Sequence, residues 1–222
     1  LYKTLVEAGF SESAILKSGL VYKNDNGSYY EKFYNRLMFP IIDVYGNIIG
    51  FGGRVLGDGM PKYLNSPETE IFSKSKNLYN LNLAKKSNNR ELILVEGYMD
   101  AISLHAAGID WAVASMGTAF AQEQAKLLAR AADEVVFSYD SDAAGQRATV
   151  RAVSIAKEVG LKVRVLIVPD GKDPDEFVRK HGKDAYLRLI ETAVSGIEFQ
   201  MQYVISQNNV SNLAGKVEAV SN

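Results

Sequence analysis

The chain contains no cysteine, only two histidines and no long apolar run. Without cysteine it forms neither a disulfide nor a thiolate metal site, and two isolated histidines do not make a zinc site, so we expect no zinc. No stretch approaches the roughly eighteen consecutive apolar residues that a membrane-spanning helix needs. We therefore expect a cytoplasmic protein with no membrane partner.

Two further absences narrow the possibilities. The first ten residues, LYKTLVEAGF, lack the apolar core of a secretory signal, and their start at leucine rather than methionine suggests a fragment or a processed chain. No segment matches the phosphate-binding pattern GxxxxGK[ST], so a P-loop is excluded.

The charge of the chain is unevenly distributed along its length. The formal net charge is −1, but residues 1–90 hold 12 Lys or Arg against 8 Asp or Glu, and residues 91–222 hold 13 against 18. Two explanations account for this asymmetry equally well. One is chance scatter on two solvated surfaces, and the other is a basic face for nucleic acid or triphosphate beside an acidic metal pocket.

Three stretches of the second half lead an apolar run directly into carboxylates, at residues 92–100, 135–145 and 163–176. This alternation is typical of parallel βα units and predicts an α/β fold in which helices flank a parallel sheet. We expect strands near 91–95, 111–115, 134–139 and 162–168. We expect helices near 98–107, 121–131, 143–158 and 174–181.

The flanking segments differ in kind. Two short helices are predicted before residue 20, with Ser11 as an N-cap, and the turn signals between residues 20 and 65 predict an antiparallel sheet. We therefore divide the chain into an incomplete, basic α+β subdomain (1–88), a metal-binding domain (89–182) and the start of a helical subdomain (183–222).

Carboxylates follow the predicted strands at the edge where parallel sheets bind ligands. They are Glu96, Asp140, Asp142, Asp173 and Asp175, with Asp100 and Asp170 nearby. Helix capping explains Asp142 or Asp173 taken singly. So many like charges in one small volume need a counter-ion, and oxygen ligands without Cys or clustered His favour Mg²⁺ or Mn²⁺.

Two other enzyme classes use acidic residues on similar sheets. A phosphatase of the haloacid dehalogenase type carries its paired aspartates after the first strand, followed by threonine, whereas Asp140 and Asp142 follow the third strand and precede Ala143. A receiver domain needs an order of acidic residues and lysine that this chain does not have.

The motifs VEGYMD, YDSDAAG and DGKDPDE together resemble the TOPRIM domain that bacterial-type primases, topoisomerases and certain nucleases share. The upstream segments FYNRLMFPI, IIGFGGRVL and PKYLNSPET resemble the catalytic core of bacterial DNA primases. The resemblance covers roughly residues 20–195.

The resemblance implies a nucleotidyltransferase of the primosome that makes short RNA primers on single-stranded DNA from NTPs. It assigns catalysis to Glu96, Asp140 and Asp142, which would hold Mg²⁺ or Mn²⁺ together with Asp173, Asp175 and Asp100. It assigns nucleotide and DNA contacts to Arg36, Arg54, Lys62, Lys74, Tyr63 and Lys32. Where some relatives have a third arginine before MFPI, this chain has Lys32 and Tyr34.

The resemblance also implies partners. They are the DNA template, NTPs and the RNA primer–DNA heteroduplex, while the zinc-binding module and the module that meets the replicative helicase are expected outside this chain. Two alternatives stay open. One is a TOPRIM nuclease or topoisomerase fragment, and the other is a truncated core that only binds metal and nucleotide.

Overall fold

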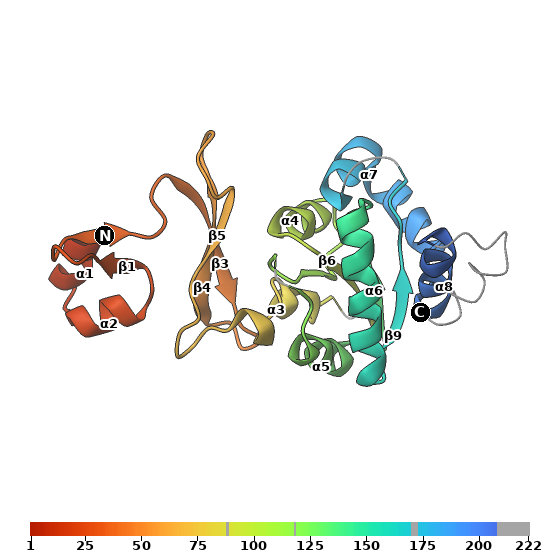
Figure 1. Ribbon diagram of the computed structural model, residues 1–222, viewed down its shortest axis with the longest axis horizontal. Coiled ribbons are helices and arrows are strands. Elements are labelled where there is room, and N and C mark those ends of the chain that lie inside the picture. The colour runs from red at the N-terminus through yellow and green to blue at the C-terminus, as the bar shows by residue number, and fades with distance from the viewer. Residues whose placement is uncertain (88, 118, 170–172, 208–222) are drawn as a thin grey trace. The chain divides into compact units, whose positions relative to one another are not determined.

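The computed structural model describes residues 1–87, 89–117, 119–169 and 173–207. It divides into two compact units, a first unit Leu1–Lys74 and a second unit Ser75–Asn222 (Figure 1). Residues 75–87 belong to the second unit because Tyr79 pairs with Ala114 and helix α3 (Leu81–Ala84) packs on strand β7 (Ala112–Ala114). The functional division at residues 88 and 182 stays a prediction.

The first unit has the predicted mixed character. Ser11 caps the second helix, since its Oγ accepts a hydrogen bond from the Ala14 N–H at 3.2 Å. Two strands form a hairpin and three more form an antiparallel sheet in the order β3-β4-β5. The elements are α1 Tyr2–Glu7, α2 Glu12–Lys17, β1 Val21–Lys23, β2 Tyr29–Glu31, β3 Arg36–Ile42, β4 Ile48–Val55 and β5 Tyr63–Asn65.

The second unit is an α/β fold around a five-stranded sheet in the order β10-β9-β8-β6-β7. Strands β6 to β9 are parallel, as predicted, and β10 joins one edge in the antiparallel sense. Besides α3 and β7, its elements are β6 Glu91–Val95, α4 Tyr98–Ala106, α5 Gln122–Ala131, β8 Glu134–Phe137, α6 Ala143–Glu158, β9 Lys162–Val165, α7 Pro174–Glu191, β10 Val194–Ser195 and α8 Gly196–Gln207. A short 3₁₀ helix, η1 (Lys74–Lys76), spans the division between the units.

Most predicted boundaries agree closely with the structure, and one is wrong. Strand β9 ends at Val165 rather than at residue 168. Helix α7 spans Pro174–Glu191, but its helical conformation is interrupted at Gly182, directly after the predicted end at residue 181. Gly182 takes a left-handed φ of 79°, and a second helical stretch follows the kink. Glycine alone adopts this conformation without steric cost, so a helix stop and a kink look alike in the sequence.

The core of the second unit lies on β6. Residues 92–95 of this strand are fully buried, as expected for a parallel strand covered on both faces. Helix α4 packs on α7, while α6 packs on α5 and α8. The chain moves from β6 to β7 on one side and then crosses to β8 on the other, so β6 and β8 flank the point where the winding reverses. Ligands of open parallel sheets bind at such a point.

The helices in the described part of the chain include none that is long and apolar enough to cross a membrane. The predicted absence of a membrane partner rests on the sequence argument alone, and the cytoplasmic location stays a prediction.

Arg164 ties three strands together at the amino end of the sheet. From β9 its Nε donates to Glu134 Oε2 on β8 at 3.0 Å, and its Nη2 donates to Glu91 on β6. Its Nη1 donates to the Ile190 carbonyl near the end of α7 at 2.9 Å. Three quarters of its side chain is buried (25% exposed), so these bonds are poorly screened by water.

We expect Arg164→Ala to lower the free energy of unfolding by about 2–3 kcal/mol, because it leaves two partly buried carboxylates side by side without a cation. Arg90→Ala is the matched control: Arg90 pairs with Asp133 on the surface, where its side chain is 81% exposed, and the loss should stay below about 1 kcal/mol. Urea unfolding followed by circular dichroism measures both. Equal losses in the two variants would contradict the bridging role.

Candidate functional site

Two carboxylates meet at the carboxyl ends of adjacent strands. Glu96 directly follows β6, Asp140 follows β8, and the Asp140 N–H donates to Glu96 Oε1 at 3.3 Å. Both side chains are half-buried and line one cavity of about 300 Å³. The cavity is lined by Glu96, Ser115, Gly117, Ala119, Phe120, Tyr139, Asp140, Asp142, Ala144, Gly145 and Ala148.

Gly145 lets helix α6 begin directly against the end of β8. A Cβ atom at this position would lie 2.1 Å from the Asp140 carbonyl oxygen, a distance that no side chain can take. With Ala144 and Ala148 also on the wall, the first turns of α6 leave space above the carboxylates. The small residues of the YDSDAAG motif are thus explained by packing as well as by access for a ligand.

Two of the predicted site residues cap helices, as their position in the sequence suggests. Asp142 is the N-cap of α6, and its Oδ1 accepts hydrogen bonds from the N–H groups of Ala144 at 2.9 Å and Gly145 at 2.8 Å. Asp173 is the N-cap of α7 and accepts from the Glu176 N–H at 2.8 Å. Both bonds go to Oδ1, so Oδ2 accepts no hydrogen bond from the described residues, and Asp142 also lines the cavity.

Negative charge accumulates at this edge. Burial, followed by the charges of Glu96, Asp173 and Asp142, raises the pKa of Asp140 to about 6. Burial is also the main cause that raises the pKa of Glu96. In the described part of the chain, no Lys, Arg or His side chain bonds to the carboxylate of Asp140 or Glu96. A bound cation would relieve this repulsion.

Asp100 and Asp175 join the amino ends of α4 and α7. Asp100 is buried, and its two oxygens accept from the N–H groups of Gly97 at 3.1 Å and Asp175 at 3.3 Å. Burial and then the charge of Asp173 raise the pKa of Asp100 to about 7. The carboxylate of Asp175 accepts from Ser103 and pairs with Arg179 at 2.6 Å. Both residues therefore make protein contacts, and their predicted role at a metal stays a prediction.

The described residues hold no ready-made group of three Asp, Glu or His side chains for a metal ion. Asp173 and Asp175 line a second, open cavity of about 510 Å³, while Asp170 lies outside the described residues. The donor set still fits Mg²⁺, since this ion keeps several waters and takes one or two carboxylates together with substrate phosphates. Glu96, Asp140 and the Asp142 Oδ2 offer hard oxygen atoms of that kind.

Four of the six predicted nucleotide and DNA contacts gather at one end of the β3-β4-β5 sheet: Arg36, Arg54, Lys62 and Tyr63. Arg54 donates to Tyr63 Oη at 3.1 Å, and its guanidinium lies 5.6 Å from the centre of that ring. Lys62 Nζ lies 5.9 Å from the same ring. Arg36 donates to the carbonyls of Gly53 at 3.3 Å and Pro61 at 2.8 Å, so it also supports the chain leading into β5.

The other two predicted basic contacts are held through their backbones. The Lys32 N–H donates to the Leu20 carbonyl at 2.9 Å, and the Lys74 N–H donates to Glu68 Oε1 at 3.0 Å. Lys32 and Lys74 are half-buried, whereas Lys62 is exposed. The structure brings Arg36, Arg54, Lys62 and Tyr63 together and places Lys32 and Lys74 on other segments of the first unit.

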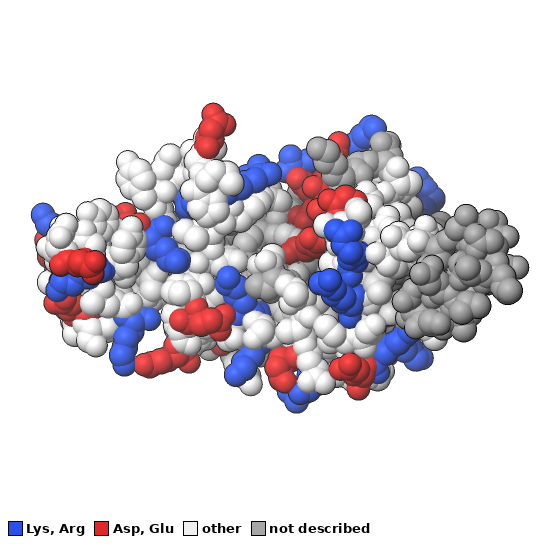
Figure 2. Space-filling model, viewed as in Figure 1, with Lys and Arg blue, Asp and Glu red and all other residues white. Residues whose placement is uncertain are grey.

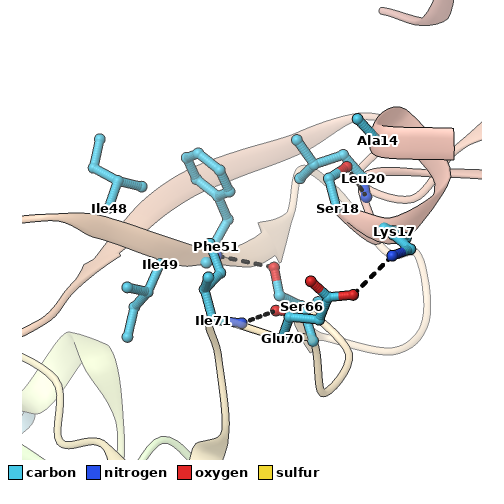
Figure 3. A pocket seen from close by; sticks show the side chains of 12 residues that line it. Ala14, Lys17, Ser18, Leu20, Ile48, Ile49, Phe51, Ser66, Glu70 and Ile71 are labelled. Atoms are coloured by element: carbon cyan, nitrogen blue, oxygen red, sulfur yellow. Dashed lines mark hydrogen bonds and ion pairs between the residues drawn. The ribbon is translucent and has the colours of Figure 1, made fainter. Parts of the chain in front are cut away.

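The first unit also contains an apolar cavity of about 390 Å³ (Figure 3). Leu20, Ile48, Ile49, Phe51 and Ile71 contribute its apolar wall, and a Lys17–Glu70 ion pair of 2.9 Å lies at its rim. The Phe51 N–H donates to Ser66 Oγ at 3.0 Å, and the Phe51 ring is half-buried.

Sequence reasoning missed several residues of the acidic cavity. Phe120 and Tyr139 form part of its wall although both are almost fully buried. Tyr139 stands two residues beyond the end of β8 and continues the buried run of residues 135–139, so the apolar run was a signal for it. Ser103, which bonds Asp175, gave no signal because its partner lies 72 residues away.

Known proteins match both units. A model described as the N-terminal domain of the DNA primase catalytic core matches residues 1–85, and a Toprim-like model matches residues 93–178. A DNA primase of Clostridium acetobutylicum is 50% identical over 213 residues, which is 96% of this chain and 36% of that protein. The chain thus spans just over a third of the length of this curated relative.

Solved structures agree over nearly the whole chain. A DnaG primase catalytic domain bound to ssDNA has a TM-score of 0.86 and 41% identity, covering 94% of this chain and 69% of that one. A DNA primase domain from Pseudomonas aeruginosa has a TM-score of 0.87 and 43% identity, covering 93% and 67%.

We expect Asp140→Asn to stabilise the protein in chelator at neutral pH by on the order of 1 kcal/mol. The folded pKa of about 6 lies above the ordinary 3.8, so ionisation of Asp140 lowers stability increasingly as the pH rises through this window. Solvent screening of the half-exposed group keeps the effect small. Thermal melts should show the gain shrinking as the pH falls towards 4.

Asp142→Ala should instead cost about 1 kcal/mol under the same conditions, since it removes the cap of α6. Loss of stability in Asp140→Asn would show that Asp140 supports the fold, and its role as an unpaired ligand would fail.

Proposed function

The chain belongs to the bacterial DNA primase family, and we propose that it is a catalytic core that synthesises short RNA primers on single-stranded DNA. The observation that carries this proposal is the pair Glu96 and Asp140. The two carboxylates stand at the ends of adjacent strands, beside a wall of small residues. Among the described residues, no Lys, Arg or His side chain bonds to either carboxylate. Such a site suits an ion that arrives with a phosphorylated substrate.

We assign Mg²⁺, with Mn²⁺ as a substitute, to Glu96, Asp140 and Asp142, in keeping with the metal dependence of the family. When bound, the ion would neutralise charge on the transferring phosphoryl group. Asp173, Asp175 and Asp100 complete the acidic surroundings. Their caps and links to α4 and α7 would fix the two helix ends that frame the site.

The proposed reaction is the attack of a ribose 3′-hydroxyl on the α-phosphate of an NTP, with pyrophosphate as the leaving group. The protein does little covalent chemistry in such a transfer, so its residues act by positioning and by electrostatics. Gly145 and the alanines of α6 admit the phosphates, while the almost fully buried Phe120 and Tyr139 form a fixed part of the wall.

In the first unit, we propose that Arg36, Arg54 and Lys62 bind phosphates of the template or of the NTP, with Lys32 and Lys74 adding positive charge. Tyr63, about one-third exposed and flanked by two cations, offers a ring face on which a base can stack. One relative was solved with ssDNA bound, which supports a DNA partner here. The RNA primer–DNA heteroduplex is a further proposed ligand, because it is the product of the reaction. A zinc-binding module and a contact with the replicative helicase are proposed for the whole protein.

Asp140→Asn and Glu96→Gln should abolish ribonucleotide incorporation on a single-stranded template while leaving DNA binding unchanged or slightly tighter, because each removes negative charge near the polyanion. Incorporation of labelled NTPs and fluorescence anisotropy measure the two properties. Strand cleavage without incorporation would favour a nuclease or topoisomerase fragment, and binding of NTP without turnover would favour a core that only binds.

Arg54→Ala and Lys62→Ala should give the opposite pattern. Each should weaken DNA or NTP binding and flatten the salt dependence by up to about one unit of slope per lost phosphate contact. Tyr45→Ala serves as the control, since Tyr45 is an exposed side chain at the turn between β3 and β4. An unchanged salt slope in both basic variants would remove these residues from the binding surface.

A further inference from the structure

Helix α6 carries two exposed arginines directly beyond the acidic cavity, Arg147 and Arg151. Within the described part of the chain, neither guanidinium has a hydrogen bond or an ion pair. Arg90, Arg164 and Arg179 of the same unit each pair with a carboxylate. The two guanidinium groups of α6 are therefore available to a ligand.

The geometry of the helix places these arginines in line with the cavity. Ala144 and Ala148 of α6 form part of the cavity wall. Arg147 and Arg151 follow Ala144 by three and seven residues, spacings that keep side chains on one face of a helix. Figure 2 shows basic side chains on α6 next to the acidic group over the first turns of α4, α6 and α7. A basic stripe thus leads from the carboxylates along the helix.

The spacing along this stripe fits successive phosphates. Four residues of α-helix rise by about 6 Å, comparable to the separation of neighbouring phosphates along one nucleic acid strand. Arg151 stands about 10 Å along the axis from Ala144, so the stripe covers more than one phosphate spacing beyond the cavity. Guanidinium groups bind phosphate oxygens in pairs of parallel hydrogen bonds.

We propose that Arg147 and Arg151 bind the phosphodiester backbone of the nucleic acid strand that passes the acidic cavity. A polyanion that approaches Glu96 and Asp140 is repelled by them, and two cations on the adjoining helix offset this repulsion without occupying the carboxylates. The inference rests on the proposed function for the identity of the ligand and adds a contact surface within the second unit.

The test measures binding of a fluorescein-labelled DNA strand, annealed to a short RNA with a single-stranded overhang, by anisotropy across a salt series. Arg147→Gln/Arg151→Gln should weaken binding about tenfold at low salt and lower the salt slope by about 1.5. Glutamine keeps the helix propensity of arginine, and a thermal melt checks the fold. Arg147→Lys/Arg151→Lys should recover most of the salt slope, since lysine keeps the charge.

Arg130→Gln is the matched control. Arg130 is exposed in the last turn of α5, just before β8 begins, at the sheet edge opposite the carboxylates. The same change of charge there should leave the affinity within about twofold of the parent and the salt slope within about 0.3 of it.

Each other outcome overturns the proposal. Equal losses in the stripe and control variants would show an effect of net charge alone. Loss of ATP binding with Mn²⁺, with unchanged binding of the hybrid, would assign the stripe to the triphosphate. A parent that does not bind the hybrid at low salt would also exclude it.

Primer synthesis is assayed separately and distinguishes the two proposals. Stripe-dependent binding in a protein that incorporates no ribonucleotide would leave the stripe standing and remove the proposed function. If the parent incorporates ribonucleotides and the stripe variants bind the hybrid as the parent does, the proposed function stands and the binding role of the stripe is excluded.

Discussion

Repulsion between carboxylates at the end of one sheet organises the second unit. Glu96 and Asp140 share a small cavity, and the charges of Asp142 and Asp173 act on Asp140 as well. The surrounding structure accommodates this charge in two ways. Backbone N–H groups at the starts of α4, α6 and α7 bind some of the carboxylates, and the others face the cavity, where a cation can reach them.

This arrangement means that one aspartate can serve the fold and the chemistry together. Asp142 uses one oxygen to cap α6, while the other makes no hydrogen bond within the described residues and the residue lines the cavity. In the sequence, capping and metal binding look like competing explanations for Asp142. A carboxylate has two oxygens, however, so one can accept from the N–H groups of α6 while the other binds a cation. Asp100 and Asp175 differ, because both oxygens of Asp100, and the one oxygen of Asp175 that Ser103 and Arg179 share, already have protein partners.

Local patterns predicted the parallel sheet, the helix α6 and the caps of Ser11, Asp142 and Asp173, because each depends on residues close together in the chain. The break of α7 after residue 181 was also predictable, whereas the joining of the two helical stretches across a kink at Gly182 depends on packing. Contacts such as Ser103 with Asp175 join distant residues and leave no periodic trace. The carboxylates of the candidate site were predictable in kind, while which of them stay free for a metal depends on partners that only the fold supplies.

The Arg164 side chain reaches Glu91 and Glu134 at the amino ends of β6 and β8, the strands whose carboxyl ends carry Glu96 and Asp140. The ion pairs of Arg164 with Glu91 and Glu134 are therefore separated from the cavity by the length of these two strands. Substitutions at Glu96 or Asp140 leave the ion pairs of Arg164 in place, and substitutions around Arg164 leave the residues of the cavity in place. Thermal stability can therefore be altered at the ion pairs of Arg164, and metal preference or substrate choice at the carboxylate cavity.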